Sequence, residues 1–186
     1  MNAVADILIP EFDEATHTYS LGPSVTQILD PLKDSSHYTM EKREFGKAVH
    51  AAIHYYNEND LDWDTLGEAF KPRVEGWARF CQDTGFTPDL IEQPMASRHG
   101  YCGKPDAVDL DLALADIKTG APEPWHAIQT ALYCSMLPNP YINRWGVYLN
   151  ERGTYTLKQF PKTDYHSDLN VGLNCLAIHN WKARHL

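Results

Sequence analysis

The sequence has no cysteine pair at the Cys-x-x-Cys spacing and no long apolar run, and each absence excludes a class of protein. Most zinc and iron–sulfur sites use closely spaced cysteine pairs. We expect free thiols and no iron–sulfur cluster, because the four cysteines are far apart, at Cys81, Cys102, Cys134 and Cys175. No stretch approaches the roughly 20 apolar residues that span a bilayer, and no basic segment leads into an apolar run at the N-terminus. We therefore expect no membrane contact and a cytoplasmic location.

Positive charge is also scarce. Sixteen Lys and Arg face 25 Asp and Glu, which gives a net charge of −9. This balance argues against a protein that coats itself with nucleic acid through bulk electrostatics, although it is compatible with a small, local site. A chain of 186 residues buries about 70% of its unfolded surface, so it needs no disulfide framework or structural metal. We expect a single domain over residues 1–186, in which any metal serves chemistry.

The spacing of apolar residues predicts an α/β fold with a central mixed β-sheet flanked by helices. A short hairpin is expected at 5–9 and 17–21, and a short helix near 25–31. Longer helices are expected at 40–57, 66–83, 125–137 and 164–184. Strands are expected at 90–96, 101–110, 112–118, 144–150 and 154–160, the first three of them neighbours.

Two carboxylates stand at the ends of neighbouring predicted strands. Asp106 follows Pro105, and Asp116-Ile117-Lys118 closes the next strand. Asp116 and Lys118 project from one face of the sheet, since they are two residues apart, and Ile117 projects from the other. Converging carboxylates repel one another and are held together best by a shared hard cation such as Mg²⁺. A lysine beside that cation can orient or deprotonate water.

This arrangement resembles the signature of the PD-(D/E)xK nuclease superfamily. Two further motifs are similar to those that mark its RecB-like exonuclease branch. They are Gly-x-x-x-His at Gly46 to His50 and Gln-x-x-x-Tyr at Gln129 to Tyr133, and all the motifs occur in the family's order. The run from 12 to 30 is also similar to the start of small phage-encoded nucleases of that branch. The resemblance covers about residues 6–150 and implies a restriction-endonuclease-like core.

The resemblance also implies a ligand set for Mg²⁺ or Mn²⁺. Asp106 and Asp116 would ligate the metal, His50 would add a nitrogen, and the Ile117 carbonyl would add an oxygen. Glu92, on the strand before Asp106, stands where many relatives keep an acid and would support a second metal. Some relatives carry an iron–sulfur cluster on four cysteines, but this chain lacks that spacing.

Other matching positions would act on water and on the DNA. Lys118 would stabilise or activate the attacking water. Gln129 and Tyr133, one helical turn apart, would position the lysine, the phosphate or the strand. A local basic rim for the DNA backbone is expected from residues nearby in the sequence, namely Lys42, Arg43, Lys47, Arg98 and Lys104.

The function that the resemblance implies is metal-dependent DNA hydrolysis by an exonuclease in phage or bacterial recombination, repair or replication. A single-strand annealing or recombination protein is the expected partner. Two alternatives remain open at this point. One is a restriction-type or structure-specific endonuclease on the same core, and the other is a non-catalytic DNA-end-binding protein that retains the fold.

Several of these side chains also have ordinary interpretations. Asp109 and Asp111 are typical turn residues, which bond locally to the backbone. His54, one turn after His50, raises the alternative of a two-histidine zinc site. The metalloprotease pattern, however, needs a Glu where this chain has Ala51. Four tryptophans are expected to pack in the interior, namely Trp77, Trp125, Trp145 and Trp181, with Trp125 the best candidate for stacking on a base.

Overall fold

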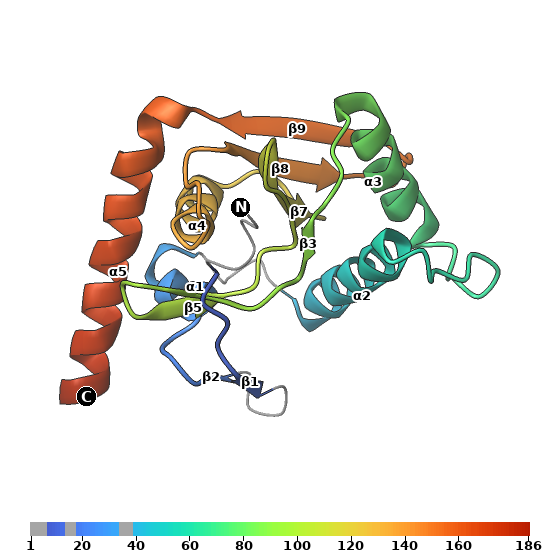
Figure 1. The fold of residues 1–186 in the computed structure, drawn as a ribbon. Helices are drawn as coiled ribbons and strands as arrows, with labels where there is room; N and C mark the ends of the chain where they lie inside the picture. Colours follow the sequence, from blue (N-terminus) through green and yellow to red (C-terminus); the bar gives the residue numbers. More distant parts are fainter. Residues whose placement is uncertain (1–6, 14–17, 34–38) are drawn as a thin grey trace.

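A mixed β-sheet lies at the centre of the fold, with helices on both of its faces (Figure 1). The computed structural model describes residues 7–13, 18–33 and 39–186. The sheet has five strands in the order β3-β6-β7-β8-β9, of which β7 and β8 are parallel and the other neighbours antiparallel. Its strands are Leu90–Ile91, Ala107–Asp109, Ala113–Lys118, Asn143–Leu149 and Tyr155–Phe160. The predicted α/β class with a central mixed sheet is confirmed.

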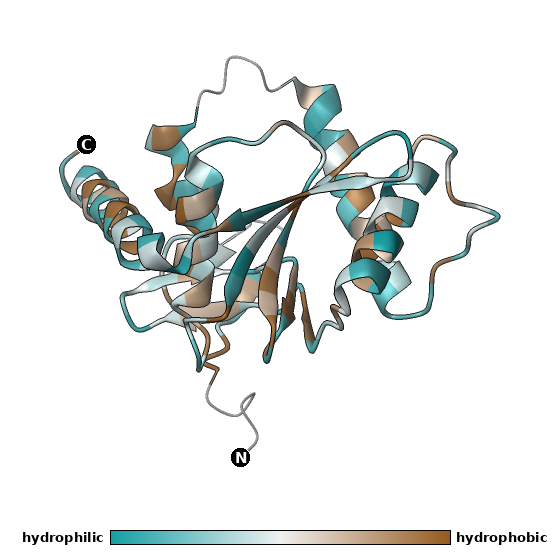
Figure 2. Ribbon diagram, turned by 90° about the horizontal axis from the view of Figure 1, so that it is seen from above, coloured by the Kyte–Doolittle hydropathy of each residue, from teal (hydrophilic) through white to brown (hydrophobic). Residues whose placement is uncertain are grey.

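Helices α2 (Met40–Asn57) and α3 (Lys71–Thr84) cover one face of the sheet. Helices α1 (Val25–Ile28), α4 (Trp125–Cys134) and α5 (Tyr165–His185) cover the other, so the sheet lies between two helical layers (Figure 2). Because side chains alternate along a strand, β7 sends its odd-numbered residues toward α2 and α3 and its even-numbered ones toward α4. No helix in the described part of the chain is long and apolar enough to cross a membrane.

Local signals in the sequence set the ends of these helices. Ser24 and Gln27 form a reciprocal capping box at the start of α1, and the Thr39 side chain accepts a hydrogen bond from the N–H of Lys42 at the start of α2. Gly85 ends α3 in the left-handed conformation, at φ 70°. The predicted helices are therefore confirmed, although α3 begins at Lys71 rather than at 66.

Two of the predicted strands are each broken in two. The segments 90–96 and 101–110 pair with one another twice, as β3 with β6 in the main sheet and as β4 (Met95–Ser97) with β5 (Tyr101–Gly103) in a separate hairpin. Glu92 interrupts the first segment at φ 44°, and Pro105, which has no N–H to donate, interrupts the second. The three expected neighbours are thus five short strands in two sheets.

The N-terminal hairpin also differs from the prediction. It pairs β1 (Phe12–Asp13) with β2 (Thr18–Tyr19), while residues 7–9 form no strand. The carbonyl of Leu8 instead accepts a hydrogen bond from Ala96, at 2.7 Å. The rest of the predicted hairpin, at residues 5, 6 and 17, lies outside the described residues.

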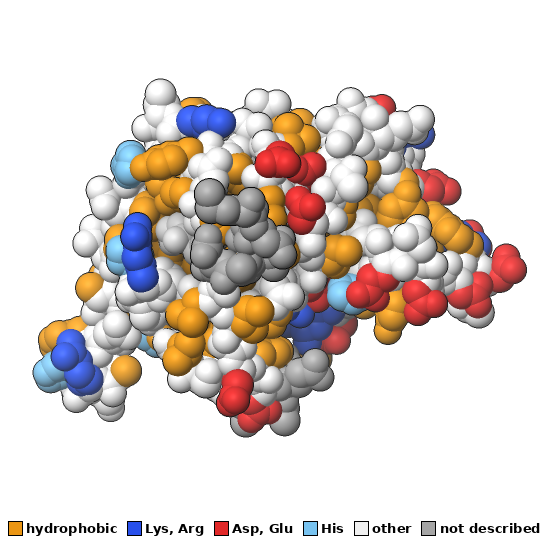
Figure 3. Space-filling model, in the orientation of Figure 1, with side chains coloured by type: hydrophobic (Ala, Val, Ile, Leu, Met, Phe, Trp, Pro, Cys, Tyr) orange, Lys and Arg blue, Asp and Glu red, His pale blue; other side chains and the backbone are white. Residues whose placement is uncertain are grey.

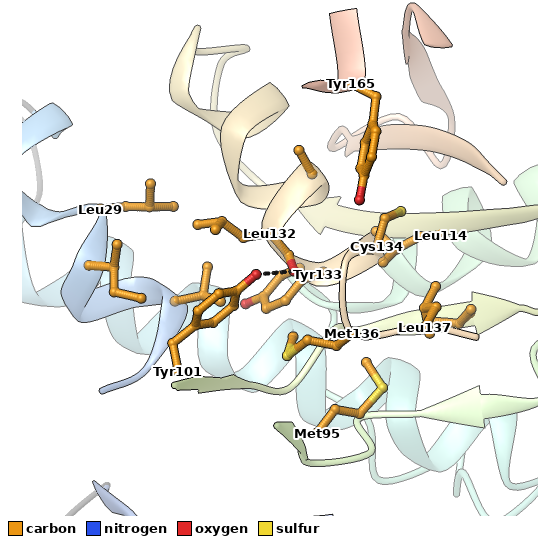
Figure 4. Close-up of a cluster of buried hydrophobic side chains, with 14 of the residues drawn as sticks. Leu29, Met95, Tyr101, Leu114, Leu132, Tyr133, Cys134, Met136, Leu137 and Tyr165 are labelled. Atoms are coloured by element: carbon orange, nitrogen blue, oxygen red, sulfur yellow. Dashed lines mark hydrogen bonds between the residues drawn. The ribbon is translucent and has the colours of Figure 1, made fainter. Parts of the chain in front are cut away.

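The interior is divided by the sheet into two apolar clusters. On the α4 face, the Tyr101 hydroxyl donates to the Leu132 carbonyl at 2.9 Å and so fixes the β4–β5 hairpin against α4 (Figure 4). On the α2 and α3 face, Trp77, Phe80 and Phe86 pack on one another. A buried tyrosine that keeps a partner for its hydroxyl costs little to bury, and it orients the elements that it joins.

One buried arginine joins three elements on the α4 face. Arg144 of β8 donates to the carbonyls of Ala127 and Pro161, each at 2.9 Å, and forms an ion pair with Asp168 of α5 at 2.8 Å. Its side chain is 2% exposed. The guanidinium is therefore stable only while its carboxylate partner and these carbonyls are in place.

We expect Asp168→Ala to lower the free energy of unfolding by about 3 kcal/mol, because it leaves a buried guanidinium without a counter-charge. Urea denaturation followed by circular dichroism measures this change. Asp111→Ala, at an exposed turn, is the control and should stay within about 0.5 kcal/mol of the unmodified chain. If both variants unfold at the same urea concentration, the ion pair does not hold these elements together.

Candidate active site

The Asp106 carboxylate contacts both α2 and β7. It lies just before β6, and one of its carboxylate oxygens, Oδ2, accepts the backbone N–H of Ile117 at 2.6 Å. The other, Oδ1, lies 3.1 Å from Nδ1 of His50, in the third turn of α2. Sequence motifs far apart in the chain are thus brought together by a single carboxylate.

Glu92 completes a group of three possible ligands with His50 and Asp106. One ligand atom from each residue lies within 4.8 Å of the other two. The backbone of Glu92 has φ 44° and its N–H donates to the Asp106 carbonyl at 3.0 Å, so the interruption between β3 and β4 turns this residue toward the cluster. Atoms that share one divalent cation at about 2.0–2.6 Å have separations of this size.

A hollow of about 10 Å³ lies beside these ligands. Its lining comprises His50, Ile53, His54, Asn57, Ile91, Glu92, Asp106 and Ile117. A space of this size holds about one water molecule or one small ion. His54 also faces Glu58, with Nε2 3.4 Å from the carboxylate, while its Nδ1 is buried without a hydrogen-bond partner.

Asp116 and Lys118 lie next to this cluster on β7. Oδ2 of Asp116 is 2.6 Å from Nζ of Lys118, and this buried oxygen has the ion pair but no hydrogen-bond partner. Asp116 is not one of the three clustered residues within the described part of the chain. The charges of Asp106 and His50 also act on Asp116, and a buried carboxylate oxygen beside a second carboxylate and an imidazole suits a hard divalent cation.

The charges of the site shift the pKa values of its members in opposite directions. Burial, reinforced by the charge of Asp106, raises the pKa of Asp116 to about 6. Burial opposes ionisation of Asp106, but the charge and hydrogen bond of His50, the charge of Lys118 and the Ile117 N–H together lower the pKa of Asp106. The pKa of His50 is raised, because the attraction of Asp106 exceeds the cost of burying the imidazolium. The site therefore keeps Asp106 ionised, while the pKa of Asp116 lies close to neutral pH.

Gln129 and Tyr133 of α4 approach the site from the other face of the sheet. Nε2 of Gln129 donates to the Tyr133 hydroxyl at 3.4 Å, while Oε1 of Gln129 is buried without a partner. Burial, together with the charges of Asp116 and Asp106, raises the pKa of Tyr133. A Cβ on Gly103 would lie 2.6 Å from the Tyr133 ring, so a glycine is needed there for the ring to reach this position.

The five cations expected to form the basic rim fall in different places, and the first of them, Lys42, is exposed in the first turn of α2. Lys104 lies within the site, with Nζ 2.7 Å from Oε2 of Glu92. Arg43 and Lys47 are exposed on α2, on the same helical stripe as His50, and Lys47 pairs with Glu44 at 2.9 Å. Arg98 is in the turn of the β4–β5 hairpin, at the end away from Lys104.

Acidic side chains gather over the segment that follows α2 (Figure 3), where Glu58, Asp60, Asp62 and Asp64 are exposed.

Sequence reasoning singled out Trp125 for stacking on a base but missed its contact with Lys118, and it missed Tyr148 beside that lysine. The Trp125 ring contacts two lysines, with Nζ of Lys118 5.8 Å and Nζ of Lys33 5.7 Å from its centroid. Tyr148, opposite Lys118 in the parallel register of β7 and β8, has its hydroxyl 2.8 Å from Nδ1 of His126. No spacing in the sequence signals these contacts, since they join separate elements.

Comparisons with known proteins find solved structures with a similar fold but no matching family. No protein-family model and no curated protein match the sequence. A crystal structure of a protein from Eubacterium rectale, described as a candidate exonuclease, matches with a TM-score of 0.59 and 14% sequence identity. The match covers 86% of this chain and 82% of that one. At this identity the likeness establishes a shared fold.

Two structures of an alkaline exonuclease from Laribacter hongkongensis also match, one of them in complex with dAMP. Their TM-scores are 0.35 and 0.32, and their identities are 14% and 15%. Each match covers 88% of this chain and 92% of the other.

The raised pKa of Asp116 predicts how the stability of the metal-free protein depends on pH. Between its usual value of 3.8 and about 6, the folded chain binds this proton and the unfolded chain does not, so ionisation destabilises the fold as pH rises. We expect Asp116→Asn to be increasingly more thermostable than the unmodified chain as pH rises from 4 to 7 in EDTA. Thermal melts at fixed ionic strength measure this difference, with Asp111→Asn as the control. A difference between the two chains that is constant with pH would contradict the shift.

Proposed function

We propose that this chain is a metal-dependent deoxyribonuclease of the PD-(D/E)xK type, in the RecB-like branch, and that it is an exonuclease. The observation that carries the proposal is the cluster of His50, Glu92 and Asp106 within 4.8 Å, next to the Asp116–Lys118 ion pair. The fold shared with the Eubacterium rectale protein, which is described as a candidate exonuclease, supports it.

The donor set favours Mg²⁺ or Mn²⁺ at this centre, because carboxylate oxygens predominate and no cysteine lies among the ligands. When bound, such a cation neutralises charge on the phosphate in the transition state and makes water easier to deprotonate. Glu92, Asp106 and Asp116 would hold it together with His50, and the Ile117 carbonyl remains a proposed further ligand.

Lys118 supplies a fixed positive charge beside the site of attack. Its ion pair with Asp116 holds Nζ at one position, and a cation at that position stabilises hydroxide and the developing charge on the phosphate. The Trp125 ring, 5.8 Å from Nζ, covers the lysine from the side of α4. Gln129 and Tyr133 then position the lysine and the DNA strand, since the free Oε1 of Gln129 is available to accept a hydrogen bond.

We further propose that the chain acts on DNA in the cytoplasm as a single domain, in recombination, repair or replication. A single-strand annealing or recombination protein is its proposed partner. Lys104, Arg43 and Lys47 are the proposed contacts to the DNA backbone near the site, because they lie beside Glu92 or on the His50 stripe of α2.

Removing the charged groups of the site should abolish cleavage without unfolding the protein. We expect Asp106→Asn and Lys118→Met to lower the rate of DNA cleavage by at least about 10²–10³-fold, because each change removes charge that is needed most in the transition state. Digestion of labelled linear duplex with Mg²⁺ or Mn²⁺ measures the rate. Lys162→Met, a change at an exposed lysine, should cleave as the unmodified chain does. Undiminished cleavage in EDTA, or by Lys118→Met, would refute the assignment.

The exonuclease assignment has a separate test. An exonuclease needs a strand end, so we expect linear duplex to be degraded to mononucleotides or short products while covalently closed circles remain intact. Gel electrophoresis of both substrates in one reaction compares them directly, and a circle nicked on one strand shows whether an internal end suffices. Equal digestion of circles and linear DNA would instead indicate an endonuclease. Metal-independent DNA-end binding without cleavage would indicate a binding protein.

A further inference from the structure

A second, larger cavity adjoins the candidate active site. It has a volume of about 460 Å³ and is lined by residues that follow the parallel strands β7 and β8 and by Arg73 of α3. Figure 1 shows this end of β8 beside α3. Its lining includes Thr119 and Gly120, directly after Lys118, and Tyr148, opposite Lys118 in register. In open α/β sheets, ligands bind at the carboxyl ends of parallel strands. The cavity is of the size that holds one nucleotide-sized group.

The cavity carries positive charge that no carboxylate of the described residues pairs with, although the Arg73 guanidinium lies over the Phe45 ring, 5.7 Å from its centroid. Arg73 of α3 lines it, and Nε and Nη1 of its guanidinium are buried without a hydrogen-bond partner. No carboxylate of the described residues lies within ion-pair distance of Arg73 or of Arg152, which lines the cavity from the β8–β9 turn. A guanidinium whose N–H groups are left unpaired is costly, and an anion relieves that cost.

The remaining lining is suited to an anion with several oxygens. The hydroxyls of Thr119 and Thr156 are on the wall, and the Asn150 amide is held there by a hydrogen bond to the Thr154 hydroxyl at 2.6 Å. Glu151 is the one carboxylate among the described residues of the lining. Arginine forks with hydroxyl and amide donors match the oxygens of a phosphate.

We propose that this cavity binds a backbone phosphodiester of the DNA strand, adjacent to the bond that is cleaved. The proposal deepens the proposed function and rests on it. Thr119 is the residue after Lys118, and the same threonine hydroxyl lies 3.6 Å from where a Cβ on Gly46 would stand. A strand whose phosphate is held by Arg73 and Arg152 therefore passes directly beside the lysine and the start of α2. This contact gives an acidic protein a local hold on the strand.

Measuring DNA binding in the absence of metal tests this proposal independently of catalysis. Fluorescence anisotropy in EDTA measures the affinity of the full chain for a short labelled single strand over a series of salt concentrations. We expect Arg73→Met and Arg152→Ala each to weaken binding about tenfold and to reduce the slope of log K against log[salt] by about 0.7, the value for one lost phosphate contact. Arg73→Lys keeps the charge but not the forked pair of N–H donors, so its affinity should lie between those of the unmodified chain and Arg73→Met.

Arg79→Met is the matched control, since Arg79 is an exposed arginine of the same helix outside the cavity. Its affinity and salt slope should equal those of the unmodified chain. Circular dichroism reports whether Arg73→Met is folded, and if it is not, the exposed Arg152 carries the test alone. Unchanged slopes in folded Arg73→Met and in Arg152→Ala would overturn the proposal, even if the unmodified chain cleaves DNA.

A further comparison distinguishes an internal phosphodiester from a phosphate at the end of the strand. Strands with a 5′-phosphate and with a 5′-hydroxyl should bind equally well, because the proposed contact is to an internal phosphodiester. An affinity for the 5′-phosphorylated strand more than about fivefold higher, lost in Arg152→Ala, would overturn the backbone assignment in favour of a strand end. Failure of the chain to cleave any DNA, with both arginines still governing the salt slope, would refute the nuclease proposal alone.

Discussion

The constraint on which the site depends is the burial of two carboxylates beside one another. Asp106 and Asp116 repel, and the protein offsets this cost from both faces of the sheet. His50 and the Ile117 N–H stabilise the charge of Asp106, and Lys118 stabilises that of Asp116. Burial still raises the pKa of Asp116 to about 6. A cation bound by these oxygens would remove the remaining cost, so the same charges that weaken the metal-free fold prepare the site for a divalent metal.

Interruptions in the sheet do as much for the site as its regular strands. The break after β3 turns Glu92 toward Asp106 at φ 44°, and the break after β5 places Asp106 in a loop, free to face both β7 and α2. Continuous strands would alternate these side chains between the two faces and separate them. On the α4 side, the Tyr133 ring packs against Gly103 and so lies close to these side chains.

The acidic balance of the chain is compatible with a nuclease when its charges are placed in space. Part of the net charge of −9 belongs to the ligand cluster, and another part lies on the segment after α2 (Figure 3). Positive groups without a carboxylate partner, Arg73 and Arg152, line one cavity at the ends of β7 and β8. Affinity for DNA would then come from a few local contacts and would fall steeply with salt.

The sequence by itself determined the class of fold and the approximate positions of the helices, and it supplied the residues proposed for the site, because helical periodicity, caps and short motifs are local properties. Its prediction of unbroken strands over 90–96 and 101–110 was wrong, since the pairing is interrupted at Glu92, whose backbone turns to φ 44°, and at Pro105, which has no N–H to donate. Only the tertiary structure decided that Glu92 joins His50 and Asp106, that Asp116 pairs with Lys118 instead, and that Arg98 lies apart from Lys104. Arg73 gave no signal, because an arginine in an amphipathic helix is ordinary until the structure shows what its guanidinium lacks.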